Sequence, residues 1–282
     1  MADLTRVLRA LYTEAWLIEP EMHRRLCDMA WAHVTETAHE PGGIVAEFAK
    51  EDRKPADKSD VRMDDGVAVV EVDGVIGRKF SSFLNSSGVT SVDVLAKILT
   101  EAAEDSSVSA VVLDVDSPGG TVTGTPEASQ AVAELSRVKP VVAYTGGMMA
   151  SAAYWLSVPA DAIFAEPSAS VGSIGVYAAL LDVTRNFEMN GYKTELFKAG
   201  KYKAAGVPGV PLTDEQREQI QDEVDEIAGW FKSTVTANRG DVEAETMEGQ
   251  TFLGRDAVGV GLVDQIGTLA DATAYARSQV AA

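Results

Sequence analysis

The spacing of apolar residues changes along this chain of 282 residues. In the first 48 residues, apolar side chains recur at helical spacing, which predicts a helical segment over 1–48 that is broken near Glu19-Pro20. Residues 51–60 are polar throughout and contain a proline, so they have too little apolar surface to fold by themselves. The pattern therefore predicts a polar linker over 49–64 and a separate domain over 65–282.

Beyond residue 65, short β-rich runs alternate with stretches of helical length. The apolar run 110–115 is typical of a strand that is covered on both faces. Thr125-Pro126 and the Thr213/Gln216 spacing are signals of helix N-termini. The alternation predicts an α/β fold with a largely parallel sheet and helical crossovers. The expected strands cover 67–72, 110–115, 141–144, 162–165 and 194–197, and the expected helices cover 92–104, 125–138, a start near 151, and 213 to the stop at 238–240.

Composition narrows the classes of partner. The net charge of −19, from 43 acidic and 24 basic residues, disfavours non-specific binding to nucleic acid or to an anionic membrane. No apolar run approaches the roughly 18 residues that span a bilayer, and the first residues lack the order of a secretory signal. A single cysteine offers neither a disulfide framework nor a metal cluster. We therefore expect a cytoplasmic protein without a metal site and without membrane insertion.

The distribution of nucleophiles and bases limits the possible hydrolytic chemistry. All three histidines and the one cysteine lie in the first 40 residues. A hydrolase built from the remainder must use another pair, unless the N-terminal segment folds back to supply a histidine. A serine activated by a neutral lysine is the option that these residues offer. The candidates are Ser151 and the cluster that holds Lys201 and Lys203, although a capping or packing serine and solvated lysines are the simpler interpretation of each alone.

Gly119 and Gly120 follow the apolar strand in the run Asp116-Ser-Pro-Gly-Gly120. Two glycines at the end of a strand let backbone amides approach a ligand closely, as an oxyanion hole requires. A tight turn explains the same run equally well. Phosphate binding is disfavoured because neither a Walker lysine nor a GxGxxG pattern lies nearby.

Taken in order, four motifs resemble those of the S49 peptidases, the signal peptide peptidase A family. They cover the oxyanion loop, the nucleophile, a Gly-Ser-Ile-Gly run and the base. At the nucleophile, this chain has Ser151-Ala-Ala-Tyr154 where the family usually has Ser-Gly-Gly-Tyr. The likeness extends over about residues 65–275 and implies that Lys203, rather than Lys201, is the base. The four motifs are 116–120, 150–154, 171–176 and 200–203.

The resemblance implies a ClpP/crotonase-like twisted superhelix with an N-terminal helical segment, and a serine endopeptidase with a Ser151/Lys203 dyad. The oxyanion would be held by the amides of Gly119 or Gly120 together with that of Ser151. Met148, Met149 and Ser173 are candidates for substrate binding, although core packing explains the methionines as well. No cofactor is implied.

The implied partners are extended polypeptides that dock by strand addition, and further copies of the chain. Related bacterial enzymes form rings in which a neighbour supplies the lysine, so we expect a homo-oligomer. The run 16–22 is similar to the leader of phage and prophage members. This points to the processing of scaffold or capsid proteins during phage head maturation, in the host cytoplasm or the prohead.

Three other functions are compatible with these residues. One is a cytoplasmic peptidase that degrades signal peptides or misfolded chains. Another is a crotonase-like acyl-CoA enzyme, which would favour a carboxylate acid/base and basic residues near its pocket, and neither is evident in the sequence. The third is a head component of the same fold that has no catalytic activity.

Overall fold

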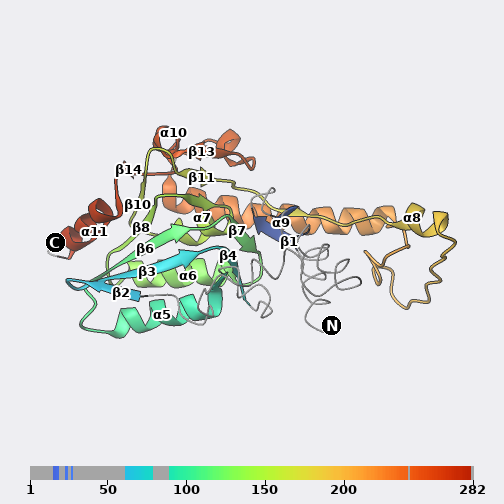
Figure 1. The fold of residues 1–282 in the computed structure, drawn as a ribbon, viewed down its shortest axis with the longest axis horizontal. Coiled ribbons are helices and arrows are strands. Elements are labelled where there is room, and N and C mark those ends of the chain that lie inside the picture. The colour runs from blue at the N-terminus through green and yellow to red at the C-terminus, as the bar shows by residue number, and fades with distance from the viewer. Residues whose placement is uncertain are drawn as a thin grey trace, which may run out of the picture.

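A computed structural model describes residues 15–18, 23–24, 27, 61–78, 89–240 and 242–280 (Figure 1). The body of the molecule is built on a six-stranded sheet with the order β14-β10-β8-β6-β3-β2. All neighbouring pairs in it are parallel except β2 with β3. Its strands are β2 (Val61–Asp64), β3 (Val67–Asp73), β6 (Ala110–Asp116), β8 (Val141–Thr145), β10 (Ala162–Ala165) and β14 (Gln265–Ile266).

Both faces of this sheet are buried, because alternate side chains of each strand enter different apolar clusters. In β3, Ala68 and Val70 belong to the cluster beneath helices α5 and α6, whereas Val67 and Val69 belong to the cluster with helix α11. Phe164 of β10 and Tyr275 of α11 pack in the second cluster with ring centroids 5.4 Å apart and planes tilted by 51°. The helices are α5 (Val92–Glu104), α6 (Thr125–Ser136), α7 (Ala152–Ser157), α8 (Thr184–Met189), α9 (Asp214–Arg239), the 3-10 turn η1 (Ala244–Met247), α10 (Gly254–Gly259) and α11 (Leu269–Gln279).

Two smaller sheets lie at the carboxyl ends of the parallel strands. One has the order β12-β1-β7-β4-β5, and the other has the order β13-β11-β9. The strands of the first are β1 (Ala15–Ile18), β4 (Val75–Gly77), β5 (Val89–Ser91), β7 (Gly119–Thr121) and β12 (Tyr177–Ala178). The strands of the second are β9 (Met148–Ala150), β11 (Ser170–Gly172) and β13 (Thr251–Leu253).

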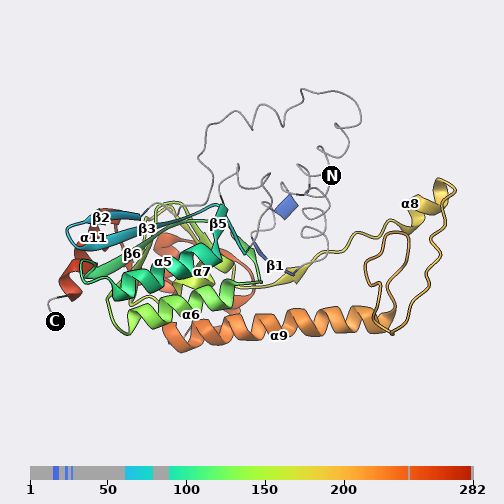
Figure 2. The same ribbon diagram turned by 90° about the horizontal axis from the view of Figure 1, so that it is seen from below.

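An arm projects from the body, formed by residues 179–213 and the first half of α9 (Figure 2). Thr213 begins α9 with a capping box, in which its hydroxyl accepts from the Gln216 amide and the Gln216 side chain accepts from the Thr213 amide. Further along α9, Ile227, Phe231 and Val235 are buried against the body. The apolar stripe of α9 is therefore fully buried only in the second half of the helix.

The architecture confirms most of the predicted elements. The chain has the α/β arrangement of parallel strands and crossover helices, and the predicted strands at 67–72, 110–115, 141–144 and 162–165 are present. The capping box and the end of α9 at Arg239 are also as predicted.

Three predictions were wrong. Ala15–Ile18 is a strand rather than a helix, because its neighbours β7 and β12 supply strand partners on both sides. Val61–Asp64, placed in the linker, forms the antiparallel edge strand β2. Thr194–Phe197 is not a strand, since it lies in the arm, where no strand pairs with it among the described residues. The other parts of the predicted helical segment 1–48 and of the linker lie almost wholly outside the described residues.

Replacing Phe231 by alanine should destabilise the protein by about 3–5 kcal/mol, as expected for a buried aromatic side chain. Phe231 is fully buried and stacks on Trp155 with centroids 4.7 Å apart and planes at 5°. Chemical denaturation would measure the loss. Trp230→Ala is the matched control, because Trp230 is 52% exposed on the same helix. Equal losses in the two variants would contradict the proposed packing of α9.

Asp114→Asn should raise the melting temperature at pH 7. Burial, and then the nearby Glu71 carboxylate, raise the pKa of Asp114 above its usual value of 3.8. At pH 7, the folded protein therefore carries a partly buried negative charge, which lowers its free energy of unfolding. As pH falls towards 3.8, the folded wild type takes up this proton before the unfolded chain does, so the advantage of the variant should shrink. Calorimetry across this range measures the difference. Asp222→Asn, on an exposed face of α9, should show no such trend.

Candidate active site

Ser151 lies at a sharp turn between strand β9 and helix α7. Its backbone has φ 56° and ψ −117°, a conformation that costs a non-glycine residue on the order of 1–3 kcal/mol. The Ser151 amide donates to the Gly172 carbonyl at 2.8 Å, and β9 is tied to Ser117 by bonds of 2.7 and 3.1 Å. A serine at a strained strand-to-helix turn is the arrangement that presents a nucleophile in many hydrolases.

Ser173 lies beside this turn although 22 positions separate the two serines in the sequence. Strands β9 and β11 are parallel with Ala150 opposite Gly172, so Ser151 and Ser173 follow directly from paired residues. Ser173 also has a positive φ, of 52°, and its amide donates to the Gln250 carbonyl at 2.8 Å. The structure therefore brings together two of the predicted site residues at adjacent strand ends.

Gly119 and Gly120 form the start of β7, against the Ser151 turn. A Cβ on Gly119 would contact the Leu17 carbonyl and would lie 3.0 Å from both the Ala150 carbonyl oxygen and the Ala152 nitrogen. A Cβ on Gly120 would collide with the Ile76 carbonyl. Close backbone packing therefore requires glycine at both positions, and it places Gly119 against the residues that flank Ser151.

Two of the three amides expected to hold an oxyanion make bonds within the chain. The Gly119 amide donates to Ser117 Oγ at 3.1 Å, and the Ser151 amide donates to Gly172. Ser117 Oγ in turn donates to the Gly74 carbonyl at 2.6 Å. Ala152 opens helix α7, and an amide in a first helical turn has no acceptor within its helix. The Ala152 amide is thus a donor that the sequence analysis did not consider.

The two methionines differ in their surroundings. Met149 is fully buried in the main apolar cluster, so its side chain belongs to the core. Met148 is half-buried, and its amide donates to Asp116 Oδ1 at 3.0 Å. Of the pair, only Met148 retains surface that a substrate can touch.

Several motif residues act as supports for the turn. The buried Tyr154 hydroxyl donates to the Leu262 carbonyl at 2.9 Å, which anchors α7 to the C-terminal run 261–267. Burial raises the pKa of Tyr154 well above its usual value of 10.0. The Asp116 carboxylate supports the strand before the turn, because it accepts from the Met148 amide and lies against Gly147. In the sequence, Asp116 and Tyr154 were recognisable only by their positions inside the motifs 116–120 and 150–154.

Tyr144, at the carboxyl end of β8, is paired with Glu166. Its hydroxyl donates to Glu166 Oε1 at 3.0 Å. Burial and this hydrogen bond raise the pKa of Tyr144 to about 12, so the phenol stays protonated at neutral pH. Among the described residues, no group of three or more histidine, cysteine or acidic side chains is arranged to hold a metal ion.

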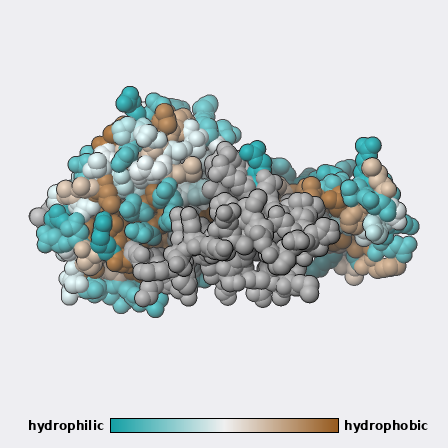
Figure 3. Space-filling model, in the orientation of Figure 1, coloured by the Kyte–Doolittle hydropathy of each residue, from teal (hydrophilic) through white to brown (hydrophobic). Residues whose placement is uncertain are grey.

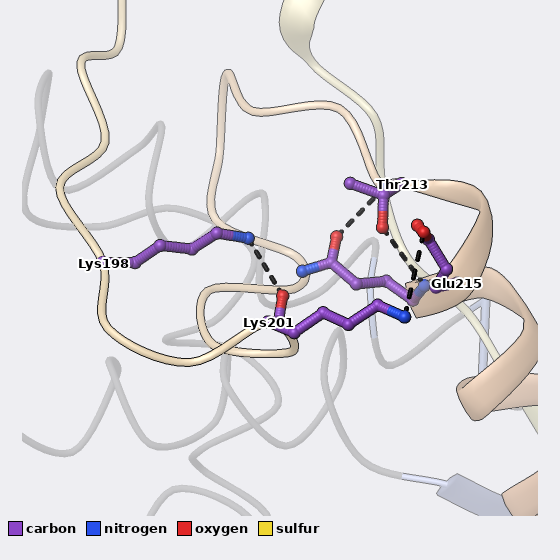
Figure 4. Close-up of polar contacts among 5 residues, drawn as sticks. Lys198, Lys201, Thr213 and Glu215 are labelled. Carbon is purple, nitrogen blue, oxygen red and sulfur yellow. Dashed lines mark hydrogen bonds and ion pairs between the residues drawn. The ribbon is translucent and has the colours of Figure 1, made fainter.

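The lysine cluster lies on the arm, near the start of α9 (Figure 4). Lys201 forms an ion pair with Glu215 at 3.8 Å and lies 5.2 Å from the centre of the Tyr202 ring. Lys198 donates to the Lys201 carbonyl at 3.0 Å. Lys203 is exposed, and its backbone is held at two points: its amide donates to the Gly200 carbonyl at 3.3 Å, and its carbonyl accepts from the Gln216 side chain at 3.5 Å. Within the described part of the chain, its amine has no ion-pair partner.

Within one chain, Lys203 lies far from Ser151. Lys203 is held at Gln216 in the first turn of α9, whereas Trp155, one turn beyond Ser151, stacks on Phe231. Fifteen residues separate Gln216 from Phe231, which is roughly 22 Å along a helix. The expected burial of the lysine against the serine is therefore not met within a single chain.

The comparisons identify relatives among proteases. The chain is 39% identical over 178 residues to the protein named Putative protease MJ0651 of Methanocaldococcus jannaschii, covering 62% of this chain and 57% of that protein. It is 30% identical to capsid assembly protease C of Escherichia phage lambda, covering 86% and 55%. It is 27% identical to the head-tail preconnector protein GP5 of Enterobacteria phage P21, covering 96% and 56%. The chain thus spans about half the length of these relatives.

Solved structures resemble the chain more distantly. An enoyl-CoA hydratase/isomerase from Acinetobacter baumannii, described as putative in its name, aligns with a TM-score of 0.47 at 17% identity, covering 79% of this chain and 81% of that one. Within the described residues, no helix is long and apolar enough to cross a membrane.

The model of peptidase family S49 matches residues 133–282, more than half of the sequence. This chain therefore belongs to peptidase family S49.

Proposed function

We propose that this protein is a serine endopeptidase in which Ser151 is the nucleophile and Lys203 the general base. The observation that carries the proposal is the strained, buried turn at Ser151, with Gly119 packed against the residues on either side of it. A backbone held in an unfavourable conformation by several hydrogen bonds is typical of a functional site. Membership of a peptidase family supports the same assignment.

The reaction follows from these groups. A neutral Lys203 amine takes the Ser151 proton while Oγ attacks the scissile carbonyl, and the resulting oxyanion is held by backbone amides. Among the candidate donors, the Ala152 amide opens α7 and has no acceptor within its helix, whereas Gly120 lies in β7 between β1 and β4. The lysine then gives its proton to the leaving amine as the C–N bond breaks. Water hydrolyses the acyl ester and restores the serine.

A second copy of the chain would supply the lysine. The arm carries Lys203 away from its own Ser151, and it exposes large apolar side chains that its own body leaves uncovered (Figure 3). Phe197 is 91% exposed and Met189 is 77% exposed. Docking of this arm on a neighbour would bury them and bring the lysine into a dry site, where the neutral amine is favoured.

The substrates we propose are scaffold or capsid polypeptides in phage head maturation, inside the host cytoplasm or the prohead. The relatives in phages lambda and P21 support this choice over a housekeeping role, because they align with most of this chain. A genomic neighbourhood without capsid and portal genes would favour a housekeeping peptidase instead.

Ser151→Ala and Lys203→Ala should each abolish processing of a co-expressed scaffold protein, with losses of at least about 10²–10⁴ in rate, as for the removal of a nucleophile or a general base. Lys201→Ala is the matched control. It removes an exposed ion pair with Glu215 and an exposed contact with the Tyr202 ring, each worth at most about 1 kcal/mol, so most activity should remain. Full activity in Lys203→Ala would refute the assigned base. A wild type that resists a serine-directed acylating probe would indicate an inactive head component.

Mixing the inactive Ser151→Ala and Lys203→Ala proteins should restore activity if the dyad forms between copies. In a random assembly, a subunit with an intact serine meets a neighbour with an intact lysine in about a quarter of cases, which sets the expected rate against wild type. Peptide hydrolysis after co-refolding measures it. Phe197→Asp should lower both the rate and the oligomeric mass. A mixture as inactive as its components would contradict the exchange of lysines.

A further inference from the structure

Strand β1 belongs to a part of the sequence far from the four motifs, yet it pairs with β7, the strand that contains Gly119 and Gly120. Ile18 is paired with Gly119, Leu17 with Gly120 and Trp16 with Thr121, in antiparallel register. The other side of β1 pairs with β12, where Trp16 is opposite Tyr177. β1 is thus held between two strands of the body (Figures 1 and 2).

The space that β1 fills has the width of one extended chain. Hydrogen-bonded strands lie about 4.8 Å apart, so β7 and β12 are separated by about 10 Å with β1 between them. In the described sheet, these two strands have β1 as their common neighbour, and β7 is paired with β4 on its other side. A polypeptide that pairs with β7 on the side away from β4 must therefore take the place of β1.

The direction of β1 is that of a bound substrate. It runs towards Gly119, which is the end of β7 that packs against Ala150 and Ala152 on either side of Ser151. A substrate strand that ran in the direction of β1 would therefore carry its next carbonyl groups towards Ser151, as the acyl side of a scissile bond requires. Ser151 is 1% exposed, so a substrate reaches it only after covering segments move.

The side chains of β1 fit this slot closely. Trp16, Leu17 and Ile18 are all at most 2% exposed. Trp16 packs on His23 with ring centroids 5.1 Å apart, and His23 also contacts Tyr177 of β12 at 5.4 Å. Leu17 joins the main apolar cluster. The slot therefore accepts bulky apolar side chains at successive positions.

We propose that the slot between β7 and β12 is the binding site of the substrate strand, and that β1 fills it as an intramolecular pseudo-substrate. The proposal rests on the peptidase function above. It defines the substrate class as extended segments with bulky apolar residues before the cleaved bond. It also makes β1 a competitor, because the apparent affinity for substrate falls with the fraction of molecules whose slot is open.

Trp16→Ala should loosen β1 and open the slot. In a Ser151→Ala background, which cannot cleave, a fluorescein-labelled peptide with the sequence Ala-Trp-Leu-Ile-Glu of residues 15–19 should bind at least about tenfold more tightly once Trp16 is replaced. Fluorescence polarisation measures the affinity. In the catalytic background, kcat/KM for a short apolar peptide should rise similarly. Trp230→Ala, remote from the slot, is the matched control and should change neither value.

A reversible lock tests the opposite direction and does not depend on the folding of Trp16→Ala. Ala15 and Ala178 are cross-strand partners, so cysteines at both positions, in a Cys27→Ser background, should tie β1 to β12. The oxidised protein should bind and cleave the peptide at least about tenfold less well. Reductant should restore both properties. Cys27→Ser alone should not respond to oxidant.

The outcomes separate this inference from the peptidase function. Suppose that Trp16→Ala binds the peptide more tightly, but that no protein with an intact Ser151 cleaves it or reacts with an acylating probe. The binding slot is then supported and the peptidase function is refuted. If wild type cleaves the peptide and neither loosening nor locking β1 changes affinity or rate, the pseudo-substrate is refuted and the peptidase function stands.

Discussion

Backbone-to-backbone packing at Gly119 and Gly120 is the constraint on which the site depends. With no side chains there, β7 lies directly against Ile76 on one side and Leu17 on the other, and it abuts the Ser151 turn. The same contact lets Ser117 and Gly172 hold the turn in its strained conformation through hydrogen bonds. A methyl group at either glycine would force these backbones apart, so the positions of the 116–120 loop, Ser151 and β1 all depend on this close packing.

The body holds Ser151 in place, whereas the arm carries Lys203, the base in the proposed function. The body holds Ser151 through a sheet buried on both faces and through the stack of Trp155 on Phe231. The arm holds the lysines with exposed ion pairs and a capping box, and it buries little apolar surface. Oligomerisation would then complete the site that a single chain leaves open, while β1 occupies the same site from within.

The failed predictions share a physical cause. Helical spacing in the N-terminal segment suggested a helix through Ala15–Ile18, but strand formation there depends on β7 and β12, which are more than a hundred residues away. Thr194–Phe197 has the composition of a strand, but no sheet edge meets it in the described structure. Met149 has the character of a pocket residue or a core residue, and only its full burial assigns it to the core.

By itself, the sequence determined the α/β class, four strands of the main sheet with the helices between them, the capping of α9 and the identity of the candidate serine, lysine and glycines. These follow from local periodicity, helix signals and ordered motifs, which do not depend on distant contacts. Only the tertiary structure decided that Ser173 lies beside Ser151, that Lys203 lies at the far end of α9 from the Phe231 contact with the body, and that β1 pairs with β7. Each of these depends on pairing between segments far apart in the chain, which no local pattern encodes.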